Sequence, residues 1–334
     1  MHAPRRHALA RAALASLAAL AGLAAAGPAA AQPGGPYPVK PITLIVPTAP
    51  GGTTDIAARM LAEPLGKALG QTVIVDNRGG ASGALAAVAV KRAEPDGYTI
   101  LMQYSGYHVI TPYVSRQPAQ WEAKDLQPVA NVLSAPQVVV VREGLPVKTL
   151  AELIAFAKKE PGKVTYASSG NGSLQHVTGA MIEQQAGIQM THIPYKGTGP
   201  ALQDLLGAQV DLTFGTPPPY MQFIQSGKLR ALAVTGKARL PSLPNVPTAA
   251  EAGLPKLDAT SWFGVFAPAK TPRPIVDRLT AEIAKIVATP AFQQKAAEQG
   301  AAADYMAPEA FGKFVDAESK RWSEIVKTSK IEAD

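Results

Sequence analysis

Short runs of Val, Ile and Leu alternate with amphipathic segments along most of this chain, and this alternation limits the available folds more than any other feature. A β-branched apolar run bounded by turn residues predicts a buried strand, and an apolar periodicity near 3.6 predicts a helix. Strands alternating with helices predict parallel α/β sheets. The expected strands are 42–46, 73–75, 98–102, 138–141, 164–167, 192–194, 210–214, 229–234 and 262–267. Helices are expected from 53, over 84–92, 150–159 and 174–185, up to 206, and over 272–288, 290–299 and 308–327.

The first strand ends in a glycine-rich turn that leads into a helix. Residues 45–61 read IVPTAPGGTTDIAARML. Glycine lets a backbone approach a ligand closely, and the free N–H groups and dipole of a helix N-terminus favour an anion. Thr53 and Asp55 are of the residue types that cap helices, so we expect Asp55 to cap the helix and fix the turn. The segment therefore predicts a site for a negatively charged group.

Further small-residue loops follow other strands. They read NRGGASG (77–83), QYSG (103–106), SSGNGS (168–173), YKGTG (195–199) and GT (215–216). Because open α/β sheets bind ligands at the carboxyl ends of their strands, these loops predict two clusters of site residues. One cluster comprises 47–54, 78–83 and 103–107, and the other comprises 168–173, 195–199 and 215–219. The long middle segment predicts two lobes that face each other across a cleft.

The N-terminal 31 residues have the features of a secretory signal peptide. Three arginines precede an apolar stretch, and Ala29-Ala30-Ala31 forms an A-x-A cleavage site before Gln32. Removing these three arginines from 32 basic residues leaves 29 against 25 acidic ones, a net charge of +4. This weak, dispersed charge argues against nucleic acid as a partner. The chain has no cysteine, so we expect a protein in the periplasm without disulfides or a lipid-anchoring cysteine.

The sequence contains few motifs that would indicate catalysis. No loop matches G-x-G-x-x-G or G-x-x-x-x-G-K-[ST], and no histidine or cysteine spacing predicts a metal site, so we expect no cofactor and no metal. A secreted hydrolase that uses Ser168 or Ser169 with His176 stays open as an alternative. No G-x-S-x-G elbow supports it, and a locally packed helix histidine is the commoner outcome. Lys196 is a candidate carboxylate ligand, although most lysines are simply solvated.

Seven separated motifs, in order across nearly the whole chain, resemble the Bug family, also called TctC-like. They are IVPTAPGGTTDIAAR, VDNRGGASGALAA, DGYTILM, YASSGNGSLQH, IPYKGTGPALQDLLGAQVDLTF, GKLRALAVTG and WFGVFAPAKTP. Members are periplasmic solute-binding receptors of tripartite tricarboxylate transporters. The resemblance implies a hinged, two-lobe periplasmic binding protein fold with a small carboxylic acid held in the cleft between the lobes. It also implies capture by backbone amides, hydroxyls and water, with little use of salt bridges.

The resemblance carries over to specific positions. The implied ligand-binding residues are Gly51, Gly52, Thr53, Ala81, Ser82, Gly83, Ser105, Ser168, Ser169, Gly170, Asn171, Lys196, Gly197, Thr198 and Thr216. Many relatives have an acid where this chain has Gly215. Such an acid could serve a ligand amino group, so an amino-acid ligand is disfavoured. Tyr104 and Tyr107 replace a small-residue pattern around Ser105, which leaves room for an unusual acid.

These observations together predict an extracytoplasmic, non-enzymatic and monomeric receptor. It would deliver a small mono- or dicarboxylate to the permease subunits of a tripartite tricarboxylate-type transporter. A sensor subunit that presents its ligand to a signalling partner stays open as a third alternative. The expected organisation is a signal peptide (1–31), the first part of lobe 1 (32–133), lobe 2 (134–260), and a return to lobe 1 with the C-terminal helices (261–334).

Overall fold

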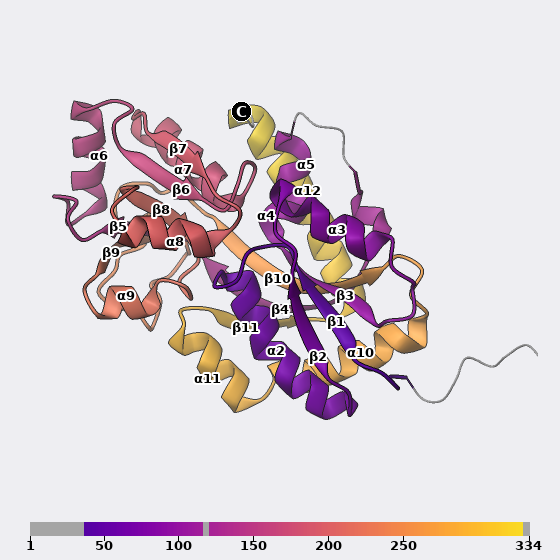
Figure 1. Ribbon diagram of the computed structural model, residues 1–334. Helices are drawn as coiled ribbons and strands as arrows, with labels where there is room; N and C mark the ends of the chain where they lie inside the picture. The colour runs from indigo at the N-terminus through magenta and orange to yellow at the C-terminus, as the bar shows by residue number, and fades with distance from the viewer. Residues whose placement is uncertain (1–36, 116–119, 330–334) are drawn as a thin grey trace, which may run out of the picture. The chain divides into compact units, whose positions relative to one another are not determined.

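A computed structural model describes residues 37–115 and 120–329 of the chain. The expected signal peptide, residues 1–31, lies outside the described residues. Residues 40–334 form one compact unit, in which the strands make two separate sheets (Figure 1). Every helix within the described ranges is too short or too polar to span a bilayer.

The first sheet has six strands, in the order β11-β4-β10-β3-β1-β2. Its strands are β1 (Ile42–Val46), β2 (Val73–Asn77), β3 (Thr99–Tyr104), β4 (Leu126–Pro136), β10 (Thr260–Pro268) and β11 (Ala302–Met306). Its longer helices are α2 (Thr53–Leu69), α3 (Ala84–Lys91), α10 (Arg273–Val287), α11 (Pro290–Glu298) and α12 (Pro308–Ser329). The short elements are η1 (Ala81–Gly83), α4 (Ser105–Val109), α5 (Thr111–Val114) and η2 (Ala123–Asp125).

The second sheet has five strands, in the order β7-β6-β8-β5-β9. These strands are β5 (Val138–Arg142), β6 (Thr165–Ser168), β7 (Thr191–Pro194), β8 (Leu212–Gly215) and β9 (Leu229–Val234). Four helices gather around this sheet in Figure 1, namely α6 (Leu150–Lys159), α7 (Leu174–Ala186), α8 (Thr198–Leu206) and α9 (Met221–Gln225). Thr149 caps α6, and its side chain accepts the Glu152 N–H at 3.1 Å.

The sheets are mixed, so the expectation of parallel sheets was wrong in part. Strands β1, β2 and β3 pair in parallel, as do β6, β7 and β8. By contrast, β10 runs antiparallel to both β3 and β4, and β5 runs antiparallel to β8 and β9. The physical reason is that β4 and β5 carry the chain from the first sheet to the second, whereas β9 and β10 carry it back. Strands that lead in opposite directions pair antiparallel and need no crossover helix.

Gln137 is the single residue between β4 and β5, where the chain first crosses between the sheets. Its N–H lies 2.9 Å from Thr235 Oγ1 and 3.1 Å from the Ala259 carbonyl oxygen, and its own carbonyl accepts the Thr235 N–H at 2.9 Å. The chain returns through residues 235–259, so Gln137 joins the outgoing and returning connections. These bonds mark the hinge between the two sheets.

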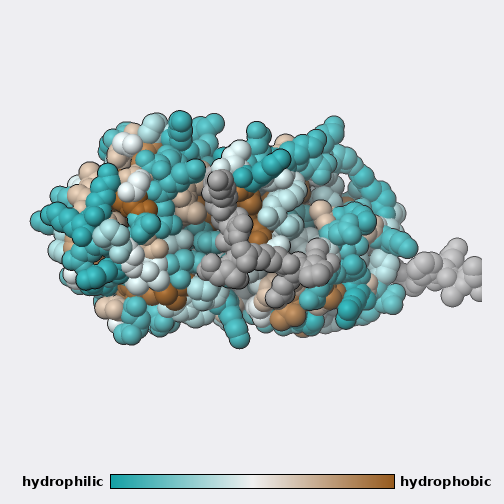
Figure 2. Space-filling view, turned by 90° about the horizontal axis from the view of Figure 1, so that it is seen from above, coloured by the Kyte–Doolittle hydropathy of each residue, from teal (hydrophilic) through white to brown (hydrophobic). Residues whose placement is uncertain are grey.

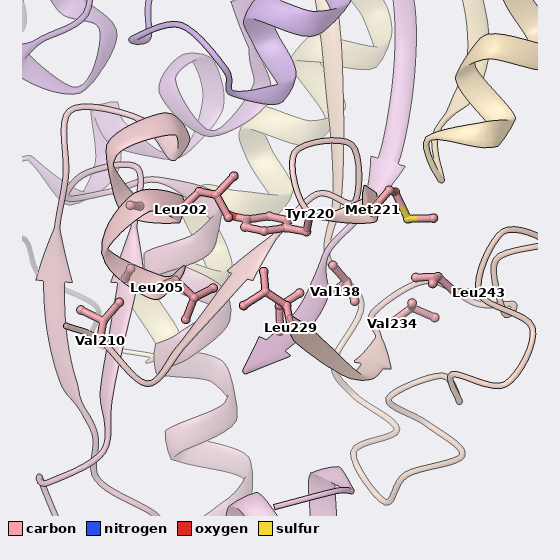
Figure 3. Close-up of a cluster of buried hydrophobic side chains, with 12 residues drawn as sticks. Val138, Leu202, Leu205, Val210, Tyr220, Met221, Leu229, Val234 and Leu243 are labelled. Atoms are coloured by element: carbon pink, nitrogen blue, oxygen red, sulfur yellow. The ribbon is translucent and has the colours of Figure 1, made fainter. Parts of the chain in front are cut away.

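Each sheet packs its own apolar core. In the second, a cluster drawn mainly from β5, β6, β9, α8 and α9 surrounds Tyr220, which is fully buried with Leu202 beside its ring (Figure 3). Both sheets thus bury apolar surface independently, as two lobes require. On the face in Figure 2, hydrophilic residues predominate and apolar surface is confined to small patches. Scattered apolar patches of this kind are ordinary on solvent-exposed protein surfaces.

Candidate functional site

The turn between β1 and α2 brings backbone N–H groups to the carboxyl end of β1. Gly51 has φ +86°, a conformation that glycine adopts without steric cost. Gly52 is the N-cap of α2, with φ −84° and ψ 166°. Neither Thr53 nor Asp55 is the N-cap, because the helix begins at Thr53. The turn therefore leads straight into the helix N-terminus, and Thr53 lies in the first turn of α2.

Asp55 holds this turn in place. Its Oδ2 accepts the Gly51 N–H at 3.0 Å, and its carboxylate accepts the Arg59 Nε–H at 3.0 and 3.1 Å. Asn77 donates from Nδ2 to Asp55 Oδ1 and to the Thr48 carbonyl, both at 3.0 Å. The expectation that Asp55 fixes the turn is confirmed. Its side chain does so by accepting the Gly51 N–H rather than by capping the helix. The bonded Arg59 offsets the negative charge beside an anion-binding helix end.

Loops of both sheets enclose a small cavity, here called the inner cavity. Its volume is about 20 Å³, roughly the room that one water molecule needs. It is lined by Thr48, Gly52, Thr53, Thr54, Tyr104, Gln137, Ser169, Gln175, Thr198, Thr216, Ser261 and Phe263. All of these side chains are neutral at pH 7, and burial keeps Tyr104 so by raising its pKa. The lining offers hydroxyls and amides but no charged partner.

Three helix N-termini meet at the inner cavity. Thr53 and Thr54 begin α2, Gln175 lies in the first turn of α7, and Thr198 begins α8. Each N-terminus carries about half a positive charge from the helix dipole. In α7 the Leu174 and His176 N–H groups are already bonded, to Tyr104 Oη and Ser173 Oγ, so this helix contributes mainly its dipole. The cavity therefore favours an anion even though its lining contains no basic side chain.

Two buried polar atoms of the lining lack a protein partner. Thr48 Oγ1 and Gln137 Oε1 form no hydrogen bond with any described residue, although these residues are only 4% and 1% exposed. Gln137 Nε2 donates to Ser261 Oγ at 2.9 Å. A buried polar group without a partner costs about 1–3 kcal/mol. Both atoms would regain a partner from a polar ligand or an ordered water.

Direct contacts join the loops of the two sheets around the cavity. Thr53 Oγ1 and Thr216 Oγ1 lie 2.6 Å apart. The Leu174 N–H donates to Tyr104 Oη at 2.9 Å, and the Tyr107 hydroxyl donates to the Ser169 carbonyl. A fourth contact runs from Ser82 Oγ to the Asn171 carbonyl at 2.8 Å. Because these contacts surround a space of one water, the two lobes are closed on each other.

Ten of the fifteen candidate residues line the inner cavity or a neighbouring pocket. Five of them line the inner cavity, namely Gly52, Thr53, Ser169, Thr198 and Thr216. A second space of about 250 Å³, here called the outer pocket, shares Ser169 with the inner cavity. Its lining is Gly80, Ala81, Ser82, Tyr107, Ser169, Gly170, Asn171, Pro194, Tyr195 and Lys196.

The remaining five candidates, Gly51, Gly83, Ser105, Ser168 and Gly197, line neither space. Gly83 and Gly197 support neighbouring structure instead. A Cβ at Gly83 would lie 2.3 Å from the Tyr107 ring, and one at Gly197 would lie 3.1 Å from the Ala49 nitrogen. Both have positive φ, so another side chain would be strained there.

Sequence reasoning missed several residues of the inner cavity. These are Gln137, Gln175, Ser261 and Phe263, whereas Thr48, Thr54 and Tyr104 lie within the predicted segments 47–54 and 103–107. Tyr104 stacks on Phe263 with ring centroids 5.8 Å apart, so β3 and β10 place one aromatic wall together. Only the pairing of β3 with β10 reveals this wall.

The arrangement around Ser168 gives little support to the hydrolase alternative. Ser168 Oγ lies 2.6 Å from Nε2 of His192, not of His176, and Ser168 is fully buried. His176 accepts the Gly172 N–H on Nδ1 at 3.2 Å and stacks on His192 at 4.1 Å. Burial, and secondarily His176, lower the pKa of His192 to about 3, so this ring stays neutral. A buried serine beside such a weak base is poorly arranged for attack on a substrate.

Gly215 is packed against a buried tyrosine. A Cβ at this position would lie 2.4 Å from the Tyr220 ring, which occupies the space of a larger side chain. Gly215 ends β8, directly before Thr216 of the inner cavity. Across residues 37–115 and 120–329, no cluster of His, Cys, Asp and Glu is placed to hold a metal ion.

Comparisons with known proteins agree with this arrangement. The structure matches the solved periplasmic binding protein BugD with a TM-score of 0.85 and 37% identity, over 89% of this chain and all of BugD. An R. palustris protein solved with adipate matches at 0.86 and 36%, over 89% of this chain and 99% of that one. MatC from Rhodopseudomonas palustris, solved with bound malate, matches at 0.82 and 32%, over 87% of this chain and all of MatC.

The two-lobe periplasmic binding protein fold and the resemblance to the Bug family are thereby confirmed. The family model for the tripartite tricarboxylate transporter family receptor, TctC, matches residues 57–331. That match covers the hinge and every strand of both sheets except β1. The chain therefore belongs to the TctC family, the receptors of tripartite tricarboxylate transporters.

Proposed function

We propose that this protein is an extracytoplasmic receptor that captures a small mono- or dicarboxylate between its lobes. The observation that carries the proposal is the meeting of three helix N-termini at a neutral, hydroxyl-lined cavity. Helix dipoles and free N–H groups attract a carboxylate without a salt bridge. The unpartnered Thr48 and Gln137 oxygens supply acceptors for a ligand hydroxyl or a bridging water.

The relatives support a carboxylate as the ligand. One was solved with adipate and another with bound malate, and each matches nearly the whole of this chain. Both ligands carry two carboxylates, which differ in the length and polarity of the connecting chain. The electrostatics of the inner cavity and the ligands of these two relatives therefore both support a small carboxylate as the ligand.

The location and partners belong to the same proposal. Export through cleavage after Ala31 would bring the receptor to the periplasm, where it passes its ligand to the permease subunits of a tripartite transporter. We place the first part of lobe 1 at 32–133, lobe 2 at 134–260, and the return to lobe 1 at 261–334. The crossing at Gln137 and the start of β10 at Thr260 support these divisions to within a few residues. We further propose that the receptor is monomeric, that it is not an enzyme, and that it needs no cofactor.

A thermal-shift screen of organic acids tests this function. An acid that binds only the folded state at a hundredfold excess over Kd stabilises it by about 2.7 kcal/mol. At least one small carboxylate should therefore raise Tm by several degrees. The matched control is the corresponding amide, such as malamide for malate, which keeps the shape and loses the charge. A panel in which amides or sugars raise Tm and no carboxylate does would contradict the proposal.

A further inference from the structure

The outer pocket lies beside the inner cavity and is built from both lobes. Gly80, Ala81, Ser82 and Tyr107 come from the first lobe, and the rest of its lining comes from the second. Its volume of about 250 Å³ exceeds that of the inner cavity by an order of magnitude. Ser169 lines both spaces, so the two spaces adjoin at this residue. A ligand with one end in the inner cavity would therefore have its other end near the outer pocket.

The outer pocket differs from the inner cavity in charge. Lys196 is the one charged side chain among its lining residues, and the lysine is exposed. Within the described part of the chain, no carboxylate lies within salt-bridge distance of Lys196. Asn171 adds a buried side-chain oxygen without a described partner. The pocket therefore presents a cation and an amide to whatever enters it.

The outer pocket also has apolar wall groups, and the hydroxyls of its two tyrosines already have hydrogen-bond partners. Tyr195 donates its hydroxyl to Asp204 Oδ2 at 2.7 Å, and Tyr107 donates its hydroxyl to the Ser169 carbonyl. Both tyrosines and Pro194 line the same pocket as Ser169 and Lys196. A methylene or aromatic spacer suits these walls, and an ionic end group suits Lys196.

We propose that the outer pocket binds the second carboxylate of an α,ω-dicarboxylate whose first carboxylate occupies the inner cavity, and that Lys196 confers the preference for diacids. This inference rests on the proposed function and narrows its ligand class. The two ends of the ligand are recognised differently. Helix N-termini hold the inner carboxylate, and one partly solvated ammonium attracts the outer one, which makes the second interaction weaker and sensitive to salt.

The test is calorimetric titration with two series of acids. The first series runs from malonate to suberate, and the second contains the straight-chain monoacids with the same carbon counts. The proteins are wild type, Lys196→Met, Lys196→Arg and the matched control Lys228→Met. Lys228 is another exposed lysine of the second lobe and lines neither space.

We expect the wild type to prefer diacids over equal-length monoacids for at least one chain length. Lys196→Met should reduce this preference about two- to fivefold, the usual range for an exposed ion pair. Lys196→Arg should retain the preference because the positive charge remains, and Lys228→Met should match the wild type. Raising the salt concentration should weaken the diacid preference of the wild type and leave Lys196→Met almost unaffected.

Equal affinities for diacids and monoacids at every length would overturn the inference and leave the proposed function intact. An undiminished diacid preference in Lys196→Met, or the same loss in Lys228→Met, would overturn it as well. Binding of no acid from either series by the folded wild type would count against the proposed function itself.

Discussion

At the residue scale, Gly215 and Tyr220 bear on which acids the receptor accepts. The Tyr220 ring fills the space that an acidic side chain at position 215 would need. The inner cavity has no carboxylate in its lining, so a ligand ammonium would find no ionic partner there. Losing hydration without such a partner costs on the order of a few kcal/mol.

The first prediction is that malate binds more tightly than aspartate. The two ligands differ mainly in a hydroxyl against an ammonium group, so they isolate the cost of burying the positive charge. Calorimetry on the wild-type protein should give the lower Kd for malate, or show binding of malate alone. Tight binding of aspartate without measurable binding of malate would show that an unrecognised acid serves the ligand amino group.

The second prediction concerns two buried histidines. Burial lowers the pKa of His108 to about 3, and burial with the neighbouring His176 does the same for His192. Between about pH 3 and the ordinary value of 6.5, the unfolded chain therefore binds more protons than the folded one. The stability that these neutral rings contribute is fully present above pH 6.5 and is lost as the pH falls toward 3.

Urea unfolding at stepwise lower pH measures this loss. Each histidine should contribute a slope of up to about 1.4 kcal/mol per pH unit within that window. His108→Gln and His192→Gln should each make the decline less steep. If both variants keep the full wild-type slope, other groups cause the acid sensitivity.

At the element scale, the connections between the sheets depend on Thr235. Thr235 is 2% exposed, and its Oγ1 accepts the Gln137 N–H at 2.9 Å and donates to the Ala259 carbonyl. The hydroxyl thus bonds the outgoing connection and the end of the returning one. A side chain of similar shape without a hydroxyl would leave these groups less well satisfied.

The third prediction is that Thr235→Val lowers the free energy of unfolding by about 1–3 kcal/mol. Thr328→Val is the matched control, because Thr328 is exposed near the end of α12 and should change stability by less than about 0.5 kcal/mol. Equal stabilities of the two variants in urea unfolding would mean that the Thr235 hydroxyl does not hold the hinge.

Some strands of the fold could be predicted from the sequence and others could not. Apolar runs bounded by turn residues identified β1 and β6, and the loops after them do reach the site. Strand β4 was missed because Pro128, Asn131 and Ser134 interrupt its apolar pattern, although its neighbours β10 and β11 cover it on both edges. Strand β11 was missed because it is short, partly exposed and at the sheet edge.

Site residues were predictable where one loop contains them and unpredictable where strand pairing brings them together. Gly52 and Thr53 follow directly from the turn after β1. Tyr104 and Phe263 are 159 positions apart in the sequence and meet only because β3 pairs with β10. Gln137 reaches the inner cavity only because the chain crosses between lobes at this residue.

At the scale of the whole molecule, the lobes are closed around a space too small for an organic acid. Contacts such as Thr53–Thr216 and Tyr104–Leu174 would have to separate for a ligand to enter. Ligand entry therefore requires a hinge motion, which places the receptor among proteins that open and close around their ligands.

The fourth prediction uses the absence of cysteine from the chain. The Thr53 and Thr216 hydroxyl oxygens lie 2.6 Å apart, so cysteines at these two positions can form a disulfide that locks the lobes. The oxidised Thr53→Cys/Thr216→Cys variant should lose acid binding, and reduction should restore it. Comparing the two redox states of one variant removes the effect of the substitutions themselves. Equal association rates in both states would exclude lobe opening as the entry route.

The fifth prediction tests the central claim, that helix N-termini rather than a basic side chain hold the inner carboxylate. A Cβ at Gly52 would lie 3.3 Å from Thr198 Cβ, so a valine there crowds the inner cavity between the two lobes. Gly52 has an ordinary φ of −84°, so Gly52→Val tests crowding of the cavity without added backbone strain.

The most direct measurement is the Kd of the best-bound acid for wild type, Gly52→Val and Lys196→Ala, each verified as folded by its Tm and circular dichroism. We predict that Gly52→Val weakens binding on the order of a hundredfold, equivalent to about two hydrogen bonds to a charged group. Lys196→Ala should weaken it only about two- to fivefold. Loss of binding in Lys196→Ala with near-normal binding in Gly52→Val would contradict the account and establish a salt-bridge receptor instead.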